Sequence, residues 1–168
     1  MKFQLKPGTT LYHGRAFPIP HIHLETLKKE VPRLVKLGVL VGQPFSQLGA
    51  PTFIILKKKG QVKVITDFRE VDKWLIRTPN PIPKNSTMLQ DMEGFTYATS
   101  LYLNMGYYTI RLDPDAQKIC TMVFPWGKYS YMHLSMDIAG SPDLFQEKML
   151  GLMESLEFVH TYLDNLLM

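Results

Sequence analysis

Apolar residues recur at helical spacing over residues 22–40. Leu27 and Leu34, with further apolar residues between and after them, fall on one side of a 3.6-residue period, which predicts an amphipathic helix. Pro32 interrupts this pattern, and a proline inside a helix costs about 3 kcal/mol. Gly38 is a typical helix stop. The pattern therefore predicts a helix that carries an unfavourable residue in its interior.

A second helix is predicted to begin at Ser141. Ser141 is a favourable N-cap, Pro142 suits the first helical position, and Asp143 places a negative charge in the first turn. We interpret the apolar stripe of this helix as core packing. The stripe consists of Leu144, Phe145, Met149, Leu152, Met153 and Leu156.

Short runs rich in β-formers occupy most of the remaining chain. Residues 52–56 and 62–66 flank a basic segment and predict a hairpin with a basic tip. Further strands or hairpins are predicted at residues 97–103, 107–112, 119–134 and 158–168, the last with a turn at Asp164-Asn165. Together with the two helices, these runs predict an α+β fold in one continuous unit.

Composition excludes several classes of protein. A chain of 168 residues with 45% hydrophobic residues can bury an ordinary core. The single cysteine, Cys120, allows no internal disulfide or cysteine-based zinc site, and its apolar neighbours predict a buried thiol. No apolar run approaches the ~20 residues of a membrane helix, and the N-terminus has no apolar block. We therefore expect an intracellular protein without a membrane partner.

The net charge of +4 does not by itself indicate a nucleic-acid partner. The basic residues nevertheless gather in two segments, residues 28–36 and 57–63. Such runs are most often solvated faces, and this interpretation stands unless other features support binding.

A series of short motifs, in this order, resembles the reverse transcriptases of gypsy-type LTR retroelements. The resemblance runs from about Phe17 to Met168 and implies a right-hand polymerase fold, truncated before the thumb. An entry arm (residues 1–20), a fingers part (21–84) and a partial palm with an antiparallel sheet (85–168) are expected. The motifs are Ala50-Pro51-Thr52-Phe53, Thr66-Asp67-Phe68-Arg69-Glu70, Pro79-Asn80-Pro81-Ile82-Pro83, Ser100-Leu101-Tyr102-Leu103, Gly106-Tyr107, Phe124-Pro125-Trp126-Gly127-Lys128-Tyr129, Ser141-Pro142-Asp143-Leu144-Phe145-Gln146 and Tyr162-Leu163-Asp164-Asn165.

The resemblance also implies how a deoxynucleotide, an RNA template and a DNA primer would be bound. Lys57 and Lys58 stand at the hairpin tip that contacts the triphosphate in the family. Lys63 stands where a second basic residue, usually arginine, holds the same phosphates; lysine lacks the planar fork of arginine. Tyr107 occupies the place of the aromatic gate that excludes a ribose 2′-hydroxyl, and Met136 lies in the nucleotide-binding region.

The family's catalytic carboxylates are largely replaced. Nucleotidyl transfer by two Mg²⁺ ions needs clustered anionic oxygen ligands, and the family supplies three aspartates. The matching positions here are Tyr102, Asp164 and Asn165, so only Asp164 keeps a charge. The expected metal ligands shrink to Asp164 and the backbone of Leu103, and we expect Mg²⁺ binding in the two-metal mode to be lost.

Three hypotheses on function remain open at this stage. The first is a retroelement-derived reverse-transcriptase protein that is catalytically inactive. The second is a nucleic-acid-binding remnant without chemistry, and the third is a decayed reading frame with no selected role. Pro32, and Ser135 and Asp137 in place of the family's Pro and Gly, favour decay over binding. Viral RNA polymerases and telomerase-like enzymes match fewer motifs. The short return strand at residues 166–168 further predicts self-association through an exposed C-terminal strand.

Overall fold

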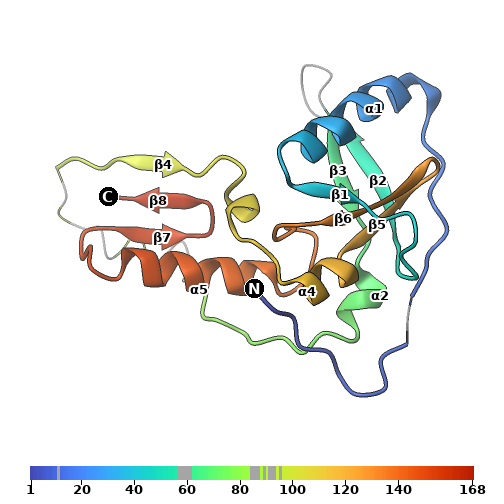
Figure 1. Ribbon diagram of the computed structural model, residues 1–168. Coiled ribbons are helices and arrows are strands. Elements are labelled where there is room, and N and C mark those ends of the chain that lie inside the picture. Colours follow the sequence, from blue (N-terminus) through green and yellow to red (C-terminus); the bar gives the residue numbers. More distant parts are fainter. Residues whose placement is uncertain (11, 57–61, 84–87, 89, 91–93, 95) are drawn as a thin grey trace.

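The computed structural model describes residues 1–10, 12–56, 62–83, 88, 90, 94 and 96–168. Its strands form two separate sheets, each covered by a helix (Figure 1). The expected mixture of helices and sheets is therefore confirmed. Over the described residues, no helix is long and apolar enough to cross a membrane.

The larger sheet has five strands in the order β1-β6-β5-β2-β3. The expected hairpins are present, with β2 paired to β3 in register from Thr52↔Thr66 to Leu56↔Val62. The sheet is mixed rather than antiparallel, because β2 and β5 run parallel. A parallel pair requires a long crossover connection, and the chain between these strands provides it. The strands are β1 (Leu40–Gly42), β2 (Ala50–Leu56), β3 (Val62–Thr66), β5 (Thr121–Phe124) and β6 (Gly127–Tyr131).

Helix α1 (His21–Lys36) packs against β1 and β3. Its buried face holds Leu27, Val31 and Leu34 as the spacing predicts. The predicted interruption at Pro32 is wrong, because the helix continues through this residue. Pro32 lies on the exposed face, so water can hydrate the carbonyl that its missing N–H leaves without a partner. The helix ends four residues earlier than expected, and Gly38 closes it with a φ of +74°.

The smaller sheet has three antiparallel strands in the order β4-β8-β7. They are β4 (Ser100–Tyr102), β7 (His160–Tyr162) and β8 (Asn165–Leu167). The prediction of an exposed C-terminal strand is wrong, since β8 lies between the other two (Figure 1). Met168 extends the pairing through two backbone hydrogen bonds with Thr99. Within the described residues, the edges of this sheet are β4 and β7.

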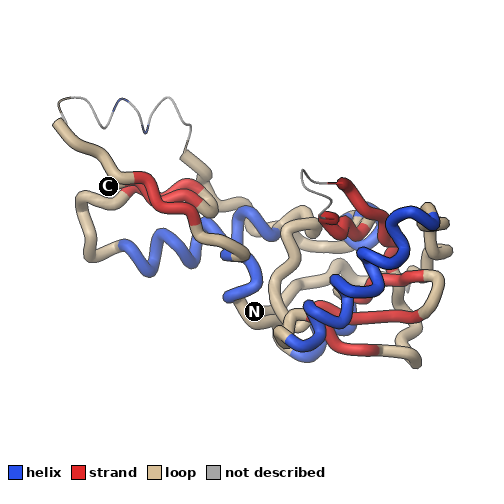
Figure 2. Tube along the Cα trace, turned by 90° about the horizontal axis from the view of Figure 1, so that it is seen from above, coloured by secondary structure: helices blue, strands red, loops and turns tan. Residues whose placement is uncertain are grey.

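Helix α5 (Ser141–Met153) lies along one face of the smaller sheet (Figure 2). Its N-cap is Gly140 rather than Ser141. The Ser141 hydroxyl instead donates to the Ser135 carbonyl, so it joins the helix to the preceding loop. The predicted core stripe is confirmed only in part, because Phe145 is buried whereas Leu152 is 70% exposed.

Three short helices were not predicted. The 3₁₀-helix η2 (Gly106–Thr109) replaces the extended segment expected at residues 107–112. Helix α4 (Pro114–Ile119) begins at Asp113, whose carboxylate accepts from the Asp115 N–H. Helix α2 (Arg69–Asp72) follows β3. All are shorter than the windows over which apolar periodicity can be recognised.

The two sheets share one apolar core that runs from α1 to α5. At the junction the rings of Tyr107 and Phe145 stack with centroids 4.5 Å apart. The exposed Arg77 guanidinium pairs with the buried Asp143 carboxylate at 2.7 Å. Cys120 is fully buried as predicted, and burial raises the pKa of its thiol. The apolar core is thus continuous between the two sheets.

We predict that Pro32→Ala stabilises the protein. Alanine restores the N–H within α1 and has a higher helix propensity, so the free energy of unfolding should rise by about 1–3 kcal/mol. Pro142→Ala is the matched control, because Pro142 lies in the first turn of α5, where no helical N–H bond is lost. Its effect should stay below about 1 kcal/mol. Urea denaturation measures both, and a destabilised Pro32→Ala variant would contradict the account.

Candidate functional site

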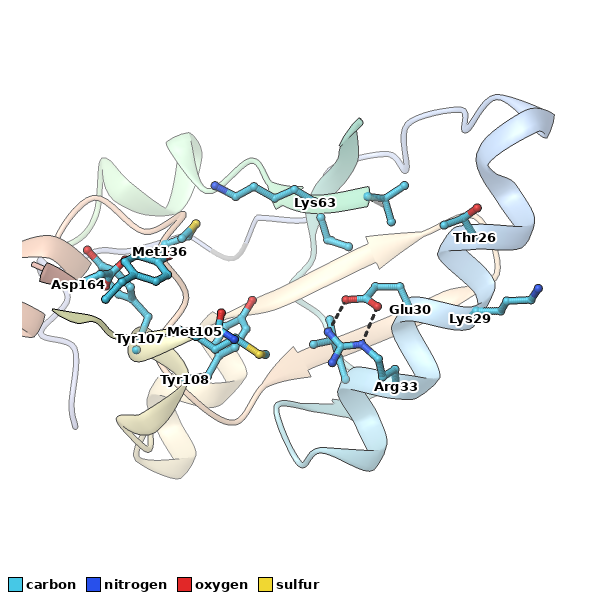
Figure 3. A pocket seen from close by; sticks show the side chains of 16 residues that line it. Thr26, Lys29, Glu30, Arg33, Lys63, Met105, Tyr107, Tyr108, Met136 and Asp164 are labelled. Carbon is cyan, nitrogen blue, oxygen red and sulfur yellow. Dashed lines mark hydrogen bonds and ion pairs between the residues drawn. The ribbon is translucent and has the colours of Figure 1, made fainter. Parts of the chain in front are cut away.

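A cleft of about 740 Å³ lies between the two sheets (Figure 3). One wall comes from α1 and β3, and the other from β4, η2 and the turn between β7 and β8. Among the residues expected from the sequence, Lys63, Tyr102, Tyr107, Met136 and Asp164 all line this cleft. Lys57 and Lys58 lie outside the described residues.

Strand pairing brings the three family carboxylate positions together. Tyr102 on β4 pairs with Asn165 on β8, and Asp164 precedes Asn165 in the turn. The predicted turn at Asp164-Asn165 is displaced by one residue, since Asn165 already belongs to β8. The Leu103 N–H donates to the Asp164 carbonyl at 2.8 Å. The end of β4 and the turn before β8, which are far apart in the sequence, thus lie side by side at Asp164.

The Asp164 carboxyl group is partly buried, and one of its oxygens makes no hydrogen bond within the described structure. Its Oδ1 atom is buried and has no hydrogen-bond partner within the described structure. A Cβ added at Gly106 would lie 3.3 Å from that oxygen and 2.9 Å from Cζ of Phe145, so only glycine fits here without displacing a neighbour. Burial raises the pKa of Asp164 above its ordinary value.

The turn that carries Asp164 is strained and is held by a buried amide. Leu163 has a φ of +48°, and such a conformation costs a non-glycine residue about 1–3 kcal/mol. Gln146, which is fully buried on α5, accepts from the Leu163 N–H at 2.8 Å. Its Nε2 donates to the carbonyl and the hydroxyl of Thr161 at 3.0 and 3.1 Å. Gln146 therefore fixes the turn to α5, a role the sequence analysis missed although it noted the motif.

Tyr107 is a rigid part of the cleft wall. Only 7% of the residue is exposed, and its ring stacks on Phe145. Burial, with a smaller effect of the Asp164 charge, raises the pKa of Tyr107 to about 12. Met105, two residues before Tyr107, has a φ of +58°, so backbone strain lies on both chain segments that flank Asp164.

The opposite wall is cationic. Lys63 extends along the cleft toward Met136 and Asp164, whereas Lys29 points away from them (Figure 3). Arg33 is engaged by both carboxylate oxygens of Glu30 at 2.7 Å. The sequence analysis treated the basic segment of α1 as a solvated face. Its place in the cleft follows from how α1 packs, which periodicity alone does not reveal.

Asp137 has a structural partner outside the cleft lining. Its carboxylate accepts from the Thr66 N–H at 2.9 Å and ties β3 to the loop after β6. Burial raises the pKa of Asp137, and the nearby charge of Lys63 opposes that rise. Asp137, where the resemblance leads one to expect a glycine, is thus accommodated by a hydrogen bond to the backbone.

The donors at the turn do not match a two-metal Mg²⁺ site. Mg²⁺ prefers anionic oxygen ligands in octahedral geometry, but Tyr102 carries a phenol and Asn165 an amide rather than a carboxylate. Asp164 has one oxygen sealed against Gly106, and the Leu103 carbonyl already accepts from the Gly106 N–H. Within the described residues, no group of three or more His, Cys, Asp or Glu side chains is placed to hold a metal ion.

We predict that Asp164→Asn stabilises the protein at neutral pH. Because the pKa of Asp164 is raised on folding, ionising it disfavours the folded state above the ordinary Asp range of about 3.9. Below that range both states are protonated and the penalty vanishes. The melting temperature of the variant should exceed that of the wild type at pH 7 and match it near pH 3.

The matched control for this measurement is Asp115→Asn. Its hydrogen bond and ion pair with Lys118 lower the pKa of Asp115, so the opposite sign is expected at pH 7. A lower melting temperature for Asp164→Asn at pH 7 would show that the carboxylate is stabilised in the folded state.

We further predict that Gln146→Leu destabilises the protein by about 1–3 kcal/mol. Leucine fills a similar volume but leaves the Leu163 N–H and the Thr161 carbonyl without their partner. Gln43→Leu, at an exposed position, is the control and should change stability by less than about 0.5 kcal/mol. If Gln146→Leu and Gln43→Leu changed the free energy of unfolding equally in chemical denaturation, Gln146 would not hold the turn to α5.

The chain is similar to short segments of much longer proteins. No protein-family model matches the chain. The uncharacterized protein K02A2.6 of Caenorhabditis elegans is 27% identical over 169 residues, covering 99% of this chain and 13% of that protein. The retrovirus-related Pol polyprotein from transposon 412 of Drosophila melanogaster is 26% identical over 176 residues, covering 99% of this chain and 14% of the polyprotein. The chain thus spans about one-seventh of these relatives.

Solved structures of a viral protease-reverse transcriptase contain a segment with the same fold as this chain. The crystal structure of a prototype foamy virus protease-reverse transcriptase mutant matches with a TM-score of 0.86 and 22% identity, covering 96% of this chain and 22% of that one. The foamy viral enzyme in complex with an RNA/DNA hybrid matches with a TM-score of 0.86 and 20% identity, covering 97% and 22%. The chain is therefore similar to one segment of retroelement Pol polyproteins and has the fold of a segment of a viral protease-reverse transcriptase.

Proposed function

We propose that this chain is the fingers and early palm of a gypsy-type reverse transcriptase, derived from a retroelement polyprotein and no longer able to polymerise. The observation that carries the proposal is that Tyr102 pairs with Asn165 across β4 and β8, next to Asp164, while Tyr102 and Asp164 line the cleft. These positions match the three aspartates of the family, and only one keeps a carboxylate. Two-metal catalysis needs the clustered negative charge that this site lacks.

In this proposal the sheets correspond to the two parts of a polymerase hand. The fingers take residues 21–84 and, because β5 and β6 pair with β2 and β1, also strands 121–131. The partial palm takes the rest of residues 85–168, and residues 1–20 form the entry arm. The cleft between the sheets is then the nucleotide site.

The nucleotide-binding roles are proposed residue by residue. Lys63, together with Lys57 and Lys58, would meet phosphates, while Tyr107 and Met136 would face the sugar and base. Support comes from Lys63, Tyr107 and Met136 lining one cleft. Further support comes from foamy viral neighbours whose structures contain double-stranded DNA or an RNA/DNA hybrid. Mg²⁺ would serve the family's chemistry, but the donors here do not fit it.

A non-catalytic nucleic-acid-binding remnant is the second candidate, and three observations favour it over a decayed reading frame. Pro32 is accommodated on an exposed helix face, and Asp137 gains a backbone partner in Thr66. The apolar core is continuous between the sheets. The substitutions that suggested decay therefore leave the scaffold intact.

We predict that the purified protein incorporates no deoxynucleotide on a primed RNA template with Mg²⁺ or Mn²⁺. Primer extension on a denaturing gel measures this, with a no-protein reaction as the control. Template-dependent extension above that control would refute the inactive assignment.

The double variant Tyr102→Asp with Asn165→Asp provides the complementary test. Three carboxylates should restore the negative electrostatic potential that binds a divalent cation. Calorimetric titration should therefore detect Mg²⁺ binding that the wild type lacks. Gln43→Glu with Gln47→Glu, at exposed positions outside the cleft lining, adds the same two negative charges and controls for a general change of charge. No gain of Mg²⁺ affinity in the double aspartate variant would contradict the assigned positions.

A further inference from the structure

Tyr102 presents an aromatic ring to the cleft in a way that packing does not explain. It is 66% exposed, whereas Tyr107 in the same cleft is 7% exposed. Large aromatic side chains ordinarily bury much of their surface. An exposed aromatic ring on the wall of a cationic cleft is the platform on which unpaired nucleobases stack.

Lys63 supplies the complementary group for a phosphate. Its side chain extends along the cleft toward Met136 and Asp164 (Figure 3). Neither Lys63 nor Lys29 forms an ion pair within the described residues, whereas Arg33 is neutralised by Glu30. Lys63 is therefore the cation best placed to meet a phosphate in the cleft.

Two methionines provide an adaptable surface around the ring. Met105 and Met136 line the cleft and are 36% and 42% exposed. Methionine is flexible and polarizable, and it makes favourable contacts with aromatic groups. The cleft volume of about 740 Å³ falls within the range of about 300–1,000 Å³ typical of small-ligand sites.

The lost carboxylates change what the cleft can accept without a metal ion. Three aspartates would repel a phosphate unless divalent cations neutralised them. Here Asp164 is the only carboxylate at the turn, and its Oδ1 is turned into the protein. A phosphate on Lys63 and a base on Tyr102 can therefore share the cleft without a divalent cation.

We propose that Tyr102 and Lys63 form a metal-independent site for a nucleotide, with the base stacked on Tyr102 and the phosphate on Lys63. This inference rests on the proposed function, since it assigns a ligand to the same cleft. The nucleotide is either free or an unpaired residue of a single strand, and both present the same base and phosphate.

The test measures binding in EDTA by fluorescence anisotropy. The probes are a labelled oligo(dA) strand, an abasic strand of equal length and charge, and unlabelled AMP as competitor. The wild type should bind oligo(dA) more tightly than the abasic strand, with affinity unchanged by added Mg²⁺. Competition by AMP would identify a free nucleotide as sufficient, whereas binding of the strand alone would identify single-stranded nucleic acid.

Variants separate stacking from charge. Tyr102→Leu should weaken oligo(dA) binding about 5- to 150-fold, which corresponds to about 1–3 kcal/mol per stacked base. Tyr102→Phe keeps the ring and should bind within about 2-fold of the wild type. Tyr97→Leu is the matched control, because Tyr97 is 89% exposed and does not line the cleft. Lys63→Gln should weaken both strands alike.

Equal binding of oligo(dA) and the abasic strand, or no binding in EDTA, would overturn the proposal. So would a Tyr102→Leu variant that binds like Tyr97→Leu. Should Tyr102→Leu fail to fold, the comparison of the two strands on the wild type decides the matter alone. Primer extension addresses the proposed function separately, so failure of metal-free binding leaves the inactive polymerase assignment standing.

Discussion

The pairing of β8 on both of its sides is the constraint on which the cleft depends. Asn165 faces Tyr102 on β4 and Tyr162 on β7 in one register. Because Asp164 occupies the turn into β8, this register fixes its carboxylate beside Tyr102. A slip of one residue would turn every β8 side chain to the other face of the sheet. Gln146 opposes such a slip, since it holds the turn to α5 through the Leu163 N–H.

Under the proposed function, electrostatics explains why Tyr102 and Asn165 are compatible with the fold in place of aspartates. Three ionised carboxylates at one turn repel one another, and only bound cations relieve that repulsion. A neutral phenol at Tyr102 and an amide at Asn165 remove two of the charges. Asp164 alone still disfavours ionisation through its burial. Under that proposal, the replacements that lower the repulsion at the turn also remove the negative charge that would hold divalent cations, so stability and catalysis would respond in opposite directions.

The sequence predicted the features that local chemistry controls. The β2–β3 hairpin, the buried face of α1 and the start of α5 follow from periodicity and turn residues. The mixed pairing of β2 with β5 was missed, because contacts between distant segments leave no local pattern. The site residues Tyr102, Asp164 and Asn165 came from resemblance to a family. The role of Gln146 was missed, since a buried amide acquires a role only once α5 packs beside the turn between β7 and β8.

Backbone strain at the site helps to distinguish altered function from decay. Met105 and Leu163 keep left-handed conformations on the two segments that flank Asp164, and each costs about 1–3 kcal/mol. Such strain persists only where surrounding contacts enforce it. The hydrogen bond that the Leu163 N–H donates to Gln146 is one of those contacts. The turn thus holds a costly geometry, although under the proposed function two of its three carboxylates are absent. Unselected drift would remove costly conformations and the contacts that enforce them as readily as carboxylates, so under that proposal the strained turn favours a cleft that accommodates a ligand.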